Sequence, residues 1–253
     1  MHSSSCFVPL GIVSARIRQM ESRLRPGQEN KAPLWEEIVP LMQQGLHKEL
    51  LRSAYKNSTH GGEIFPLREN VFTAMRLTSL EETKVVIIGQ DPYFNEHPGK
   101  GPEAHGLCFS VQNGIPVPPS LRNILQEVNN SVYNGRKVSV DSDLTRWARQ
   151  GVLLLNASLT VIAKRPNSHA NLGWHRLTDD VISTISREKK HVVFMLWGAF
   201  AQKKTAMIDR SKHLILATSH PSPLSAHRTF LGSGIFVKCN EYLQKHHIQP
   251  IEW

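Results

Sequence analysis

Four short runs of apolar residues stand out in the pattern of hydrophobic and polar positions along the chain. Each is rich in Val, Ile and Leu, and none alternates with polar residues, which predicts strands that are buried on both faces. The runs are Val85–Gly89, Val152–Asn156, Val192–Gly198 and Leu214–Thr218.

Helical patterns lie between and before these runs. Residues 35–55, 120–130 and 175–187 repeat apolar side chains at a period of about 3.6 residues, which is typical of amphipathic helices. Ser120 is a candidate N-cap for the second of them. Strands that alternate with helices indicate a parallel sheet covered on both sides. We therefore predict an α/β fold: a single domain with a central four-stranded parallel twisted sheet and helices on both faces.

The composition changes near residue 30. Residues 1–30 contain a serine run and several arginines, with Glu21 and Glu29 as the only acids, and they lack the apolar segment of a secretory signal. We expect residues 1–30 to form a basic, partly ordered N-terminal arm, with a mitochondrial presequence as the alternative. No Gly/Ser/Pro linker divides the rest, so residues 31–253 are expected to form one domain, the catalytic one.

The overall composition narrows the function classes. The chain of 253 residues carries 30 Lys and Arg against 21 Asp and Glu, a net charge of +9, which favours a polyanionic partner such as nucleic acid. A hydrophobic share of 40% argues against wholesale disorder. No apolar run approaches the roughly 18–20 residues of a membrane span, so no membrane partner is expected. Three widely spaced cysteines argue against a disulfide framework and favour a reducing compartment.

Polar side chains follow the predicted strands. Asp91 comes just after the first strand, Asn156 ends the second, and His220 follows the fourth. In open α/β sheets, ligands bind at the carboxyl ends of the strands. An acid, an amide and an imidazole that are far apart in the sequence are therefore expected to converge on one pocket.

Seven short motifs follow one another along the chain: Gly89–Tyr93, His105–Val111, Pro118–Leu121, Gly151–Asn156, Asn167–His169, Leu196–Gly198 and His220–Ser225. In their order and spacing, from about Trp35 to Trp253, they resemble the motifs of the family 1 uracil-DNA glycosylases. The resemblance implies a monofunctional enzyme of base excision repair that removes uracil from DNA by cleaving the N-glycosidic bond, with no metal and no cofactor.

The resemblance assigns the catalytic chemistry to Asp91 and His220. Bond cleavage places positive charge on the sugar and negative charge on the leaving uracil, and a site must stabilise both. The Asp91 carboxylate is expected to stabilise the sugar and orient the attacking water. Because the uracil anion is spread over two carbonyls, a hydrogen-bond donor can replace the second carboxylic acid of ordinary glycosidases. His220, as a neutral imidazole, resembles the donor to uracil O2.

The same resemblance implies how uracil is recognised. The Asn156 amide can donate to uracil O4 and accept from N3–H, whereas cytosine presents the reverse pattern. Tyr93 resembles the tyrosine beside C5 that excludes the methyl group of thymine. Phe109 resembles the aromatic residue on which the base stacks, and Gln90 is expected to contact the region of the uracil carbonyls.

DNA contacts are expected outside the uracil pocket. A glycosylase cannot reach its bond inside a stacked duplex, so the base must be flipped out. Leu224 resembles the apolar wedge that fills the vacated space. Ser120, Ser222 and Ser225 resemble the residues that bind phosphates and position the DNA without reading its sequence, and Pro119 is expected to make that contact rigid.

The sequence departs from the family pattern at two places. Phe94 stands where the family has a histidine that helps to hold the water, and the following loop, Asn95–Glu103, is about five residues longer. The loop is expected to be an ordered excursion at the rim of the pocket, in which either His97 replaces the histidine or nothing does. Ala199 and Phe200 stand where the family often has a serine and a tyrosine, which leaves one phosphate contact in question.

Two rival functions make different demands on the sequence. A zinc-dependent nucleobase deaminase needs a Cys-x-x-Cys, which this chain lacks. A non-catalytic DNA-binding protein would not need the intact Asp91 and His220, although an added accessory role in replication stays open. We expect a monomer that acts on single- or double-stranded DNA, is open to a DNA-mimicking protein inhibitor, and resides in the nucleus (a host nucleus for a viral source) rather than the mitochondrion.

Overall fold

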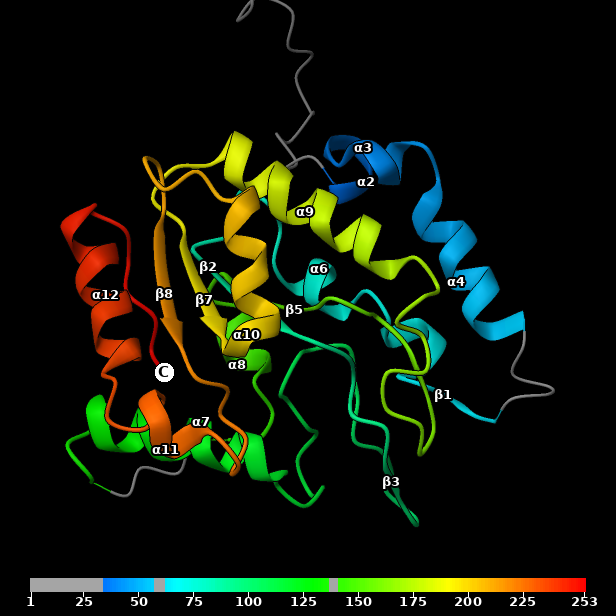
Figure 1. Ribbon diagram of the computed structural model, residues 1–253, viewed down its shortest axis with the longest axis horizontal. Helices are drawn as coiled ribbons and strands as arrows, with labels where there is room; N and C mark the ends of the chain where they lie inside the picture. The colour runs from blue at the N-terminus through cyan, green and yellow to red at the C-terminus, as the bar shows by residue number, and fades with distance from the viewer. Residues whose placement is uncertain (1–33, 57–61, 137–140) are drawn as a thin grey trace, which may run out of the picture. The chain divides into compact units, whose positions relative to one another are not determined.

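The computed structural model describes residues 34–56, 62–136 and 141–253 (Figure 1). The arm expected over residues 1–30 lies outside the described residues. The central sheet has four parallel strands in the order β5-β2-β7-β8, as the sequence predicts. Their bounds are β2 (Val85–Gly89), β5 (Val152–Asn156), β7 (Val193–Trp197) and β8 (Leu214–Thr218).

Burial along the strands follows their place in the sheet. All residues of β2, β5 and β7 are buried, as expected for runs without polar alternation. Strand β5 lies at one edge of the sheet, and its backbone is partly paired there, because the Cys108 N–H donates to the Leu154 carbonyl at 3.1 Å. The expectation that β8 is buried on both faces is wrong, because β8 lies at the opposite edge and is largely half-exposed.

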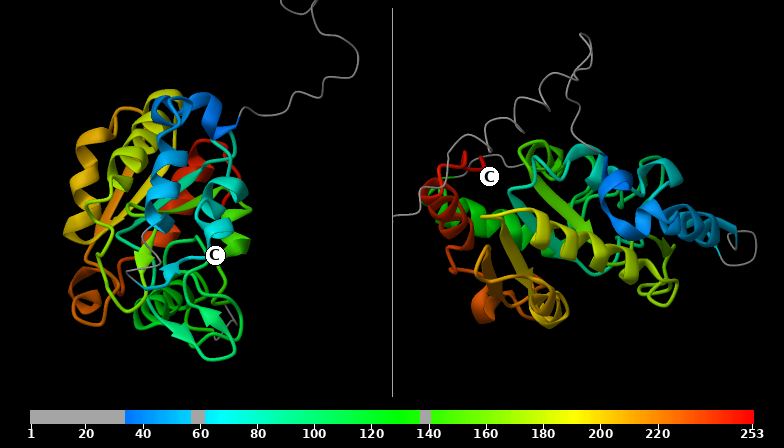
Figure 2. Two further views of the ribbon diagram at one scale, coloured as in Figure 1. Left: turned by 90° about the vertical axis from the view of Figure 1, so that its right-hand side faces the viewer. Right: turned by 90° about the horizontal axis from the view of Figure 1, so that it is seen from above.

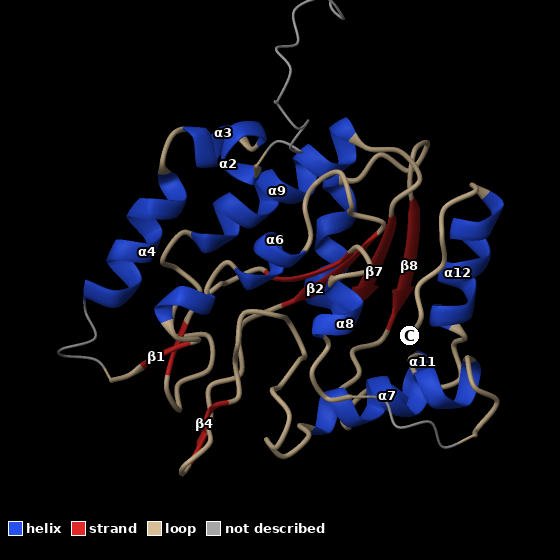
Figure 3. Cartoon of the chain, turned by 180° about the vertical axis from the view of Figure 1, so that it is seen from behind, coloured by secondary structure: helices blue, strands red, loops and turns tan. Residues whose placement is uncertain are grey.

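Helices cover both faces of the sheet. In Figure 1, α9 (Trp174–Glu188) and α10 (Gly198–Gln202) lie in front, and the view from behind in Figure 3 places α6 (Thr73–Leu77) and α8 (Thr145–Ala148) on the other side. The side view in Figure 2 shows the same layering. Further described helices are α7 (Pro119–Ser131), α11 (Ala226–Thr229), α12 (Ile235–Lys245), η1 (Arg68–Asn70) and η2 (Lys203–Met207).

Two helical predictions need correction, and a proline contributes to each. The single helix expected over residues 35–55 is three helices, α2 (Trp35–Ile38), α3 (Pro40–Gln43) and α4 (Leu46–Lys56). Pro40 has no N–H and so cannot continue α2, whereas it suits the first position of α3. Ser120 is not an N-cap, because Pro119 is the first residue of α7 and Pro118 precedes it as the cap residue.

Two small antiparallel pairs lie beside the main sheet. Strand β1 (Ile64–Phe65) pairs with β6 (Val161–Ile162), and β3 (Glu96–His97) pairs with β4 (Gly101–Pro102). The second pair shows that the long loop Asn95–Glu103 forms a hairpin, and the ordered excursion expected there is confirmed. The described residues contain no helix that is long and apolar enough to cross a membrane.

Candidate active site

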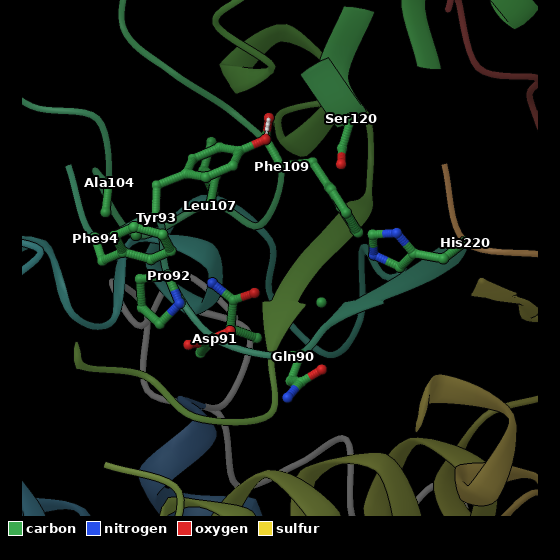
Figure 4. A pocket seen from close by; sticks show the side chains of 13 residues that line it. Gln90, Asp91, Pro92, Tyr93, Phe94, Ala104, Leu107, Phe109, Ser120 and His220 are labelled. Carbon is green, nitrogen blue, oxygen red and sulfur yellow. Dashed lines mark hydrogen bonds between the residues drawn. The ribbon is translucent and has the colours of Figure 1, made fainter. Parts of the chain in front are cut away.

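A cavity of about 280 Å³ opens where β2 and β5 end, close to the lower limit of about 300 Å³ for drug-sized ligand pockets. The structure brings Asp91, Asn156 and His220 together in its lining, so the three strand ends converge as the sequence predicts (Figure 4). Four more of the predicted site residues line the same cavity: Gln90, Tyr93, Phe109 and Ser120.

The end of β2 needs a glycine because the Asn156 amide lies against it. Gly89 pairs with Asn156 in the parallel register. A Cβ atom on Gly89 would lie 2.1 Å from Asn156 Oδ1 and 2.8 Å from Cys108 Cβ. Asn156 is 8% exposed, and its amide makes no hydrogen bond with the other described residues. Both its donor and its acceptor are therefore available to a ligand in the cavity.

Asn167 connects the two polar residues that follow β2. Its backbone N–H donates to Asp91 Oδ2 at 2.8 Å, and its Oδ1 accepts from Gln90 Nε2 at 2.6 Å. Burial raises the pKa of Asp91, while the hydrogen bonds from the backbone N–H groups of Asn167 and of Asp91 itself act in the opposite direction. Sequence reasoning gave Asn167 no role, although it belongs to a recognised motif. Its left-handed backbone, with φ of 59°, is one that asparagine tolerates well.

The hydrogen bonding of His220 fixes the state of its ring. Its Nδ1 lies 3.0 Å from the Ser222 backbone N, and a backbone N–H can only donate, so Nδ1 is the acceptor. Burial lowers the pKa of His220. The ring is therefore neutral near pH 7 with its proton on Nε2, and it can act as a hydrogen-bond donor. Gly198, with φ of +82°, allows the close approach, since a Cβ there would lie 2.9 Å from His220 Cβ.

Aromatic side chains form the walls of the cavity. The Tyr93 hydroxyl donates to the Phe109 carbonyl at 3.2 Å, which links the two walls (Figure 4). Burial also raises the pKa of Tyr93, so it stays protonated. The Phe109 ring centre lies 5.3 Å from that of Trp197 and 5.7 Å from that of His220. Phe109 has a positive φ of 63°, a conformation unusual for a bulky residue and frequent at functional sites.

The remaining predicted DNA-contacting residues lie outside the cavity lining. Pro119 begins α7, and Leu224 is 84% exposed, the highest value among the exposed large apolar side chains described. Ser222 Oγ accepts the Leu224 N–H at 3.2 Å, which leaves the Ser222 hydroxyl proton free to donate. Ser225 Oγ instead donates to the His220 carbonyl at 2.8 Å. The Ser225 hydroxyl is therefore already used within the loop, which weakens its assignment as a phosphate donor.

The structure shows where the residues at the two departures from the family pattern lie relative to the cavity. His97 does not line the cavity, and its Nε2 lies 3.0 Å from Glu103 Oε1 within the hairpin. Phe94, just before the hairpin, does line it, so this part of the wall is apolar. The geometry thus favours the alternative in which no histidine takes the water-holding place. Phe200 also lies outside the lining, with its ring centre 5.7 Å from Lys204 Nζ.

Comparison with known proteins agrees with this geometry. The family model described as "Uracil DNA glycosylase superfamily" matches residues 76–244. The uracil-DNA glycosylase of Azotobacter vinelandii is 48% identical over 240 residues, covering 93% of this chain and 97% of that protein. That of Francisella tularensis subsp. novicida is 50% identical over 220 residues, covering 87% and 97%. A crystal structure of a mimivirus UNG variant in complex with UGI superposes with a TM-score of 0.80 at 30% identity, covering 88% of each chain.

Proposed function

The chain belongs to the uracil DNA glycosylase superfamily, and we propose that it is a monofunctional, family 1 uracil-DNA glycosylase. It hydrolyses the N-glycosidic bond of deoxyuridine in DNA and leaves an abasic site, the first step of base excision repair. The observation that carries the proposal is the meeting of Asp91, Asn156 and His220 in one cavity of a size suited to a single base.

Recognition of uracil follows from the free amide of Asn156. Bound in the cavity, uracil would stack on the Phe109 ring and pair its O4 and N3–H with the Asn156 donor and acceptor. Cytosine would face the amide with donor against donor and acceptor against acceptor, and such a mispaired bidentate contact costs roughly 1–3 kcal/mol in total. Tyr93 is held against Phe109 by its hydroxyl, so its ring is a fixed wall against a 5-methyl group.

Catalysis follows from the charges that develop as the bond breaks. The Nε2–H of His220 donates to uracil O2 and stabilises the leaving anion without transferring a proton. A preorganised donor of this kind is worth on the order of 10²–10³ in rate. Asp91 stabilises the positive sugar and orients the water that attacks C1′. Its Oδ2 is held by the Asn167 N–H, which fixes the direction in which the carboxylate faces.

DNA must present the base outside the helix. We propose that Leu224, exposed at the tip of its loop, enters the space that the base leaves. Ser120 and Ser222 bind the adjacent phosphates, and Pro119 makes the backbone at this contact rigid. The net charge of +9 supports attraction to DNA of any sequence. We also propose that a protein inhibitor that mimics DNA would compete for the same surface; the similar mimivirus UNG variant was crystallised in complex with UGI.

An excision assay tests the proposed function. The full chain is incubated with single- and double-stranded oligonucleotides that contain one uracil, with a chelator present, and abasic sites are measured. We expect excision by the wild type and losses of at least about 10²-fold for Asp91→Asn and for His220→Leu. His246→Leu, just beyond the end of α12 and outside the cavity lining, is the matched control and should excise normally. Folded wild-type protein that releases no uracil would refute the proposal.

A further inference from the structure

The loop that carries His220 and Leu224 begins and ends on a reciprocal pair of hydrogen bonds. At its start, the Ser219 backbone N–H donates to Thr229 Oγ1 at 2.8 Å. At its end, the Thr229 backbone N–H donates to Ser219 Oγ at 3.2 Å. Each residue is both donor and acceptor to the other, so the two ends of residues 219–229 are held side by side. Neither residue lines the cavity.

The hydrogen bonds continue from this pair to His220. The Ser219 hydroxyl donates its proton to the Ser225 carbonyl at 2.8 Å, and the Ser225 hydroxyl donates to the His220 carbonyl at 2.8 Å. The Ser222 N–H then holds the ring through Nδ1. The backbone and the ring of His220 are thus each fixed by a hydrogen bond from within the loop, and the Ser219–Thr229 pair closes the base of this network.

The loop is also held from outside. Asn123 Nδ2 on α7 donates to the Pro221 carbonyl at 2.8 Å, and near the far end the buried side chains of Ala226 and Phe230 pack in the core. Thr229 itself is exposed at the end of α11. Among the described residues, the hydrogen bonds that join the two ends of the loop directly are those between Ser219 and Thr229.

We propose that Ser219 and Thr229 are positioning residues that hold His220 in its working orientation before DNA binds. The inference rests on the proposed function, in which the His220 Nε2–H acts on uracil O2. A donor stabilises a developing charge only when it is held at the right distance, so a loop that spreads at its base should slow the chemical step. Binding of DNA, which uses other groups, should change little.

Conservative and isosteric variants separate this role from a purely structural one. Thr229→Val keeps the shape but removes the acceptor of the Ser219 N–H, whereas Thr229→Ser keeps the hydroxyl. Ser219→Ala removes both an acceptor and a donor. Ser211→Ala is the matched control, because it removes an exposed hydroxyl hydrogen bond, to Asp209, in the turn before β8 begins.

The readout is the single-turnover excision rate at saturating enzyme on a single-stranded uracil oligonucleotide, where no base pair has to open and the Leu224 wedge is not needed. We expect Thr229→Val to lower the rate about three- to tenfold, the range for one lost hydrogen bond. Ser219→Ala should lower it at least as far. The double variant should lose less than the product of the two single losses, because both hydrogen bonds hold the same two ends of the loop. Thr229→Ser and Ser211→Ala should stay within about twofold of wild type.

The result can go against the inference in three ways. Wild-type rates for both Thr229→Val and Ser219→Ala in folded protein, checked by thermal unfolding, would overturn it. A Thr229→Ser variant as slow as Thr229→Val would also overturn it. The same holds if the variants need more enzyme for half-saturation but reach the wild-type rate at saturation. Wild-type protein without activity would instead refute the proposed function, and this inference with it.

Discussion

Replacement of Gly89 by alanine tests whether the position of the Asn156 amide governs uracil excision. Gly89 does not have a positive φ, so its backbone accepts alanine and the effect comes from the added methyl group. That methyl would lie 2.1 Å from Asn156 Oδ1, where ordinary contacts are 3.4–4 Å. The amide oxygen must therefore move by more than an ångström, away from the place where it would accept uracil N3–H.

The expected loss in excision rate follows from this displacement of the amide oxygen. A misplacement of about 1 Å in a positioned group costs about 10²-fold in rate. The Cβ contact of 2.8 Å with Cys108 adds strain in the buried region, and overpacking of this kind typically destabilises by about 1–3 kcal/mol. A domain of this size should then melt about 2–12 °C lower and still be folded at 25 °C.

The assay is single-turnover excision at 25 °C by Gly89→Ala, alone and in an Asn156→Ala background. With the amide already removed, the alanine methyl has no amide to displace, so the additional loss should be less than about threefold. The melting temperature should fall in both backgrounds, because the Cys108 contact remains. A folded Gly89→Ala protein that excises uracil at the wild-type rate would refute the reasoning about the amide.

Three further predictions follow from the site. Asn156→Asp should excise cytosine, because a carboxyl oxygen accepts from cytosine N4 where the amide donates. Release of cytosine from a cytosine-containing oligonucleotide checks this, and unchanged selectivity would remove the role given to Asn156. Leu224→Ala should slow excision from duplex DNA by about tenfold or more while leaving single-stranded DNA nearly unaffected, and equal losses on both would contradict the wedge. Asp91 works as a carboxylate and His220 as a neutral imidazole with its proton on Nε2. Burial raises the pKa of Asp91 and lowers that of His220. The rate should therefore be level from pH 7 to 8 and fall steeply on acidification between about pH 4 and 6.5, the ordinary values of the two groups; a decline from pH 7 to 8 would be inconsistent with these states.

The sheet could be predicted because its pattern is local. Val85–Gly89 contains no polar residue, and Val152–Asn156 has a polar residue only at its end, which indicates burial on both faces whatever lies around these runs. The break at Pro40 was also visible in the sequence, but the apolar period ran across it and masked the boundary between α2 and α3. The exposure of β8 could not be predicted, since the order of strands in a sheet depends on contacts far apart in the chain.

The site likewise contains features that the sequence predicts and features that depend on contacts between distant segments. Asp91, Asn156 and His220 can be predicted because strand ends and motifs lie in the sequence itself, whereas the lining residues Phe94 and Ala104 are not predicted as site residues. The hydrogen-bond partners of the site residues cannot be predicted, because they join distant segments, as Asn167 joins Asp91 across 76 residues. The use of the Ser225 hydroxyl inside the loop likewise depends on the loop's closed shape. Nuclear residence and the monomeric state stay predictions.

The central claim is that one everted uracil lies between Asp91, Asn156 and His220. A crystal structure of the full chain with DNA that carries a non-hydrolysable deoxyuridine analogue tests it most directly. The account predicts the base outside the helix and stacked on Phe109, with the Asn156 amide at O4 and N3 and His220 Nε2 within hydrogen-bond distance of O2. A uracil that stays stacked in the DNA, or that binds in a cavity lacking these three side chains, would contradict it.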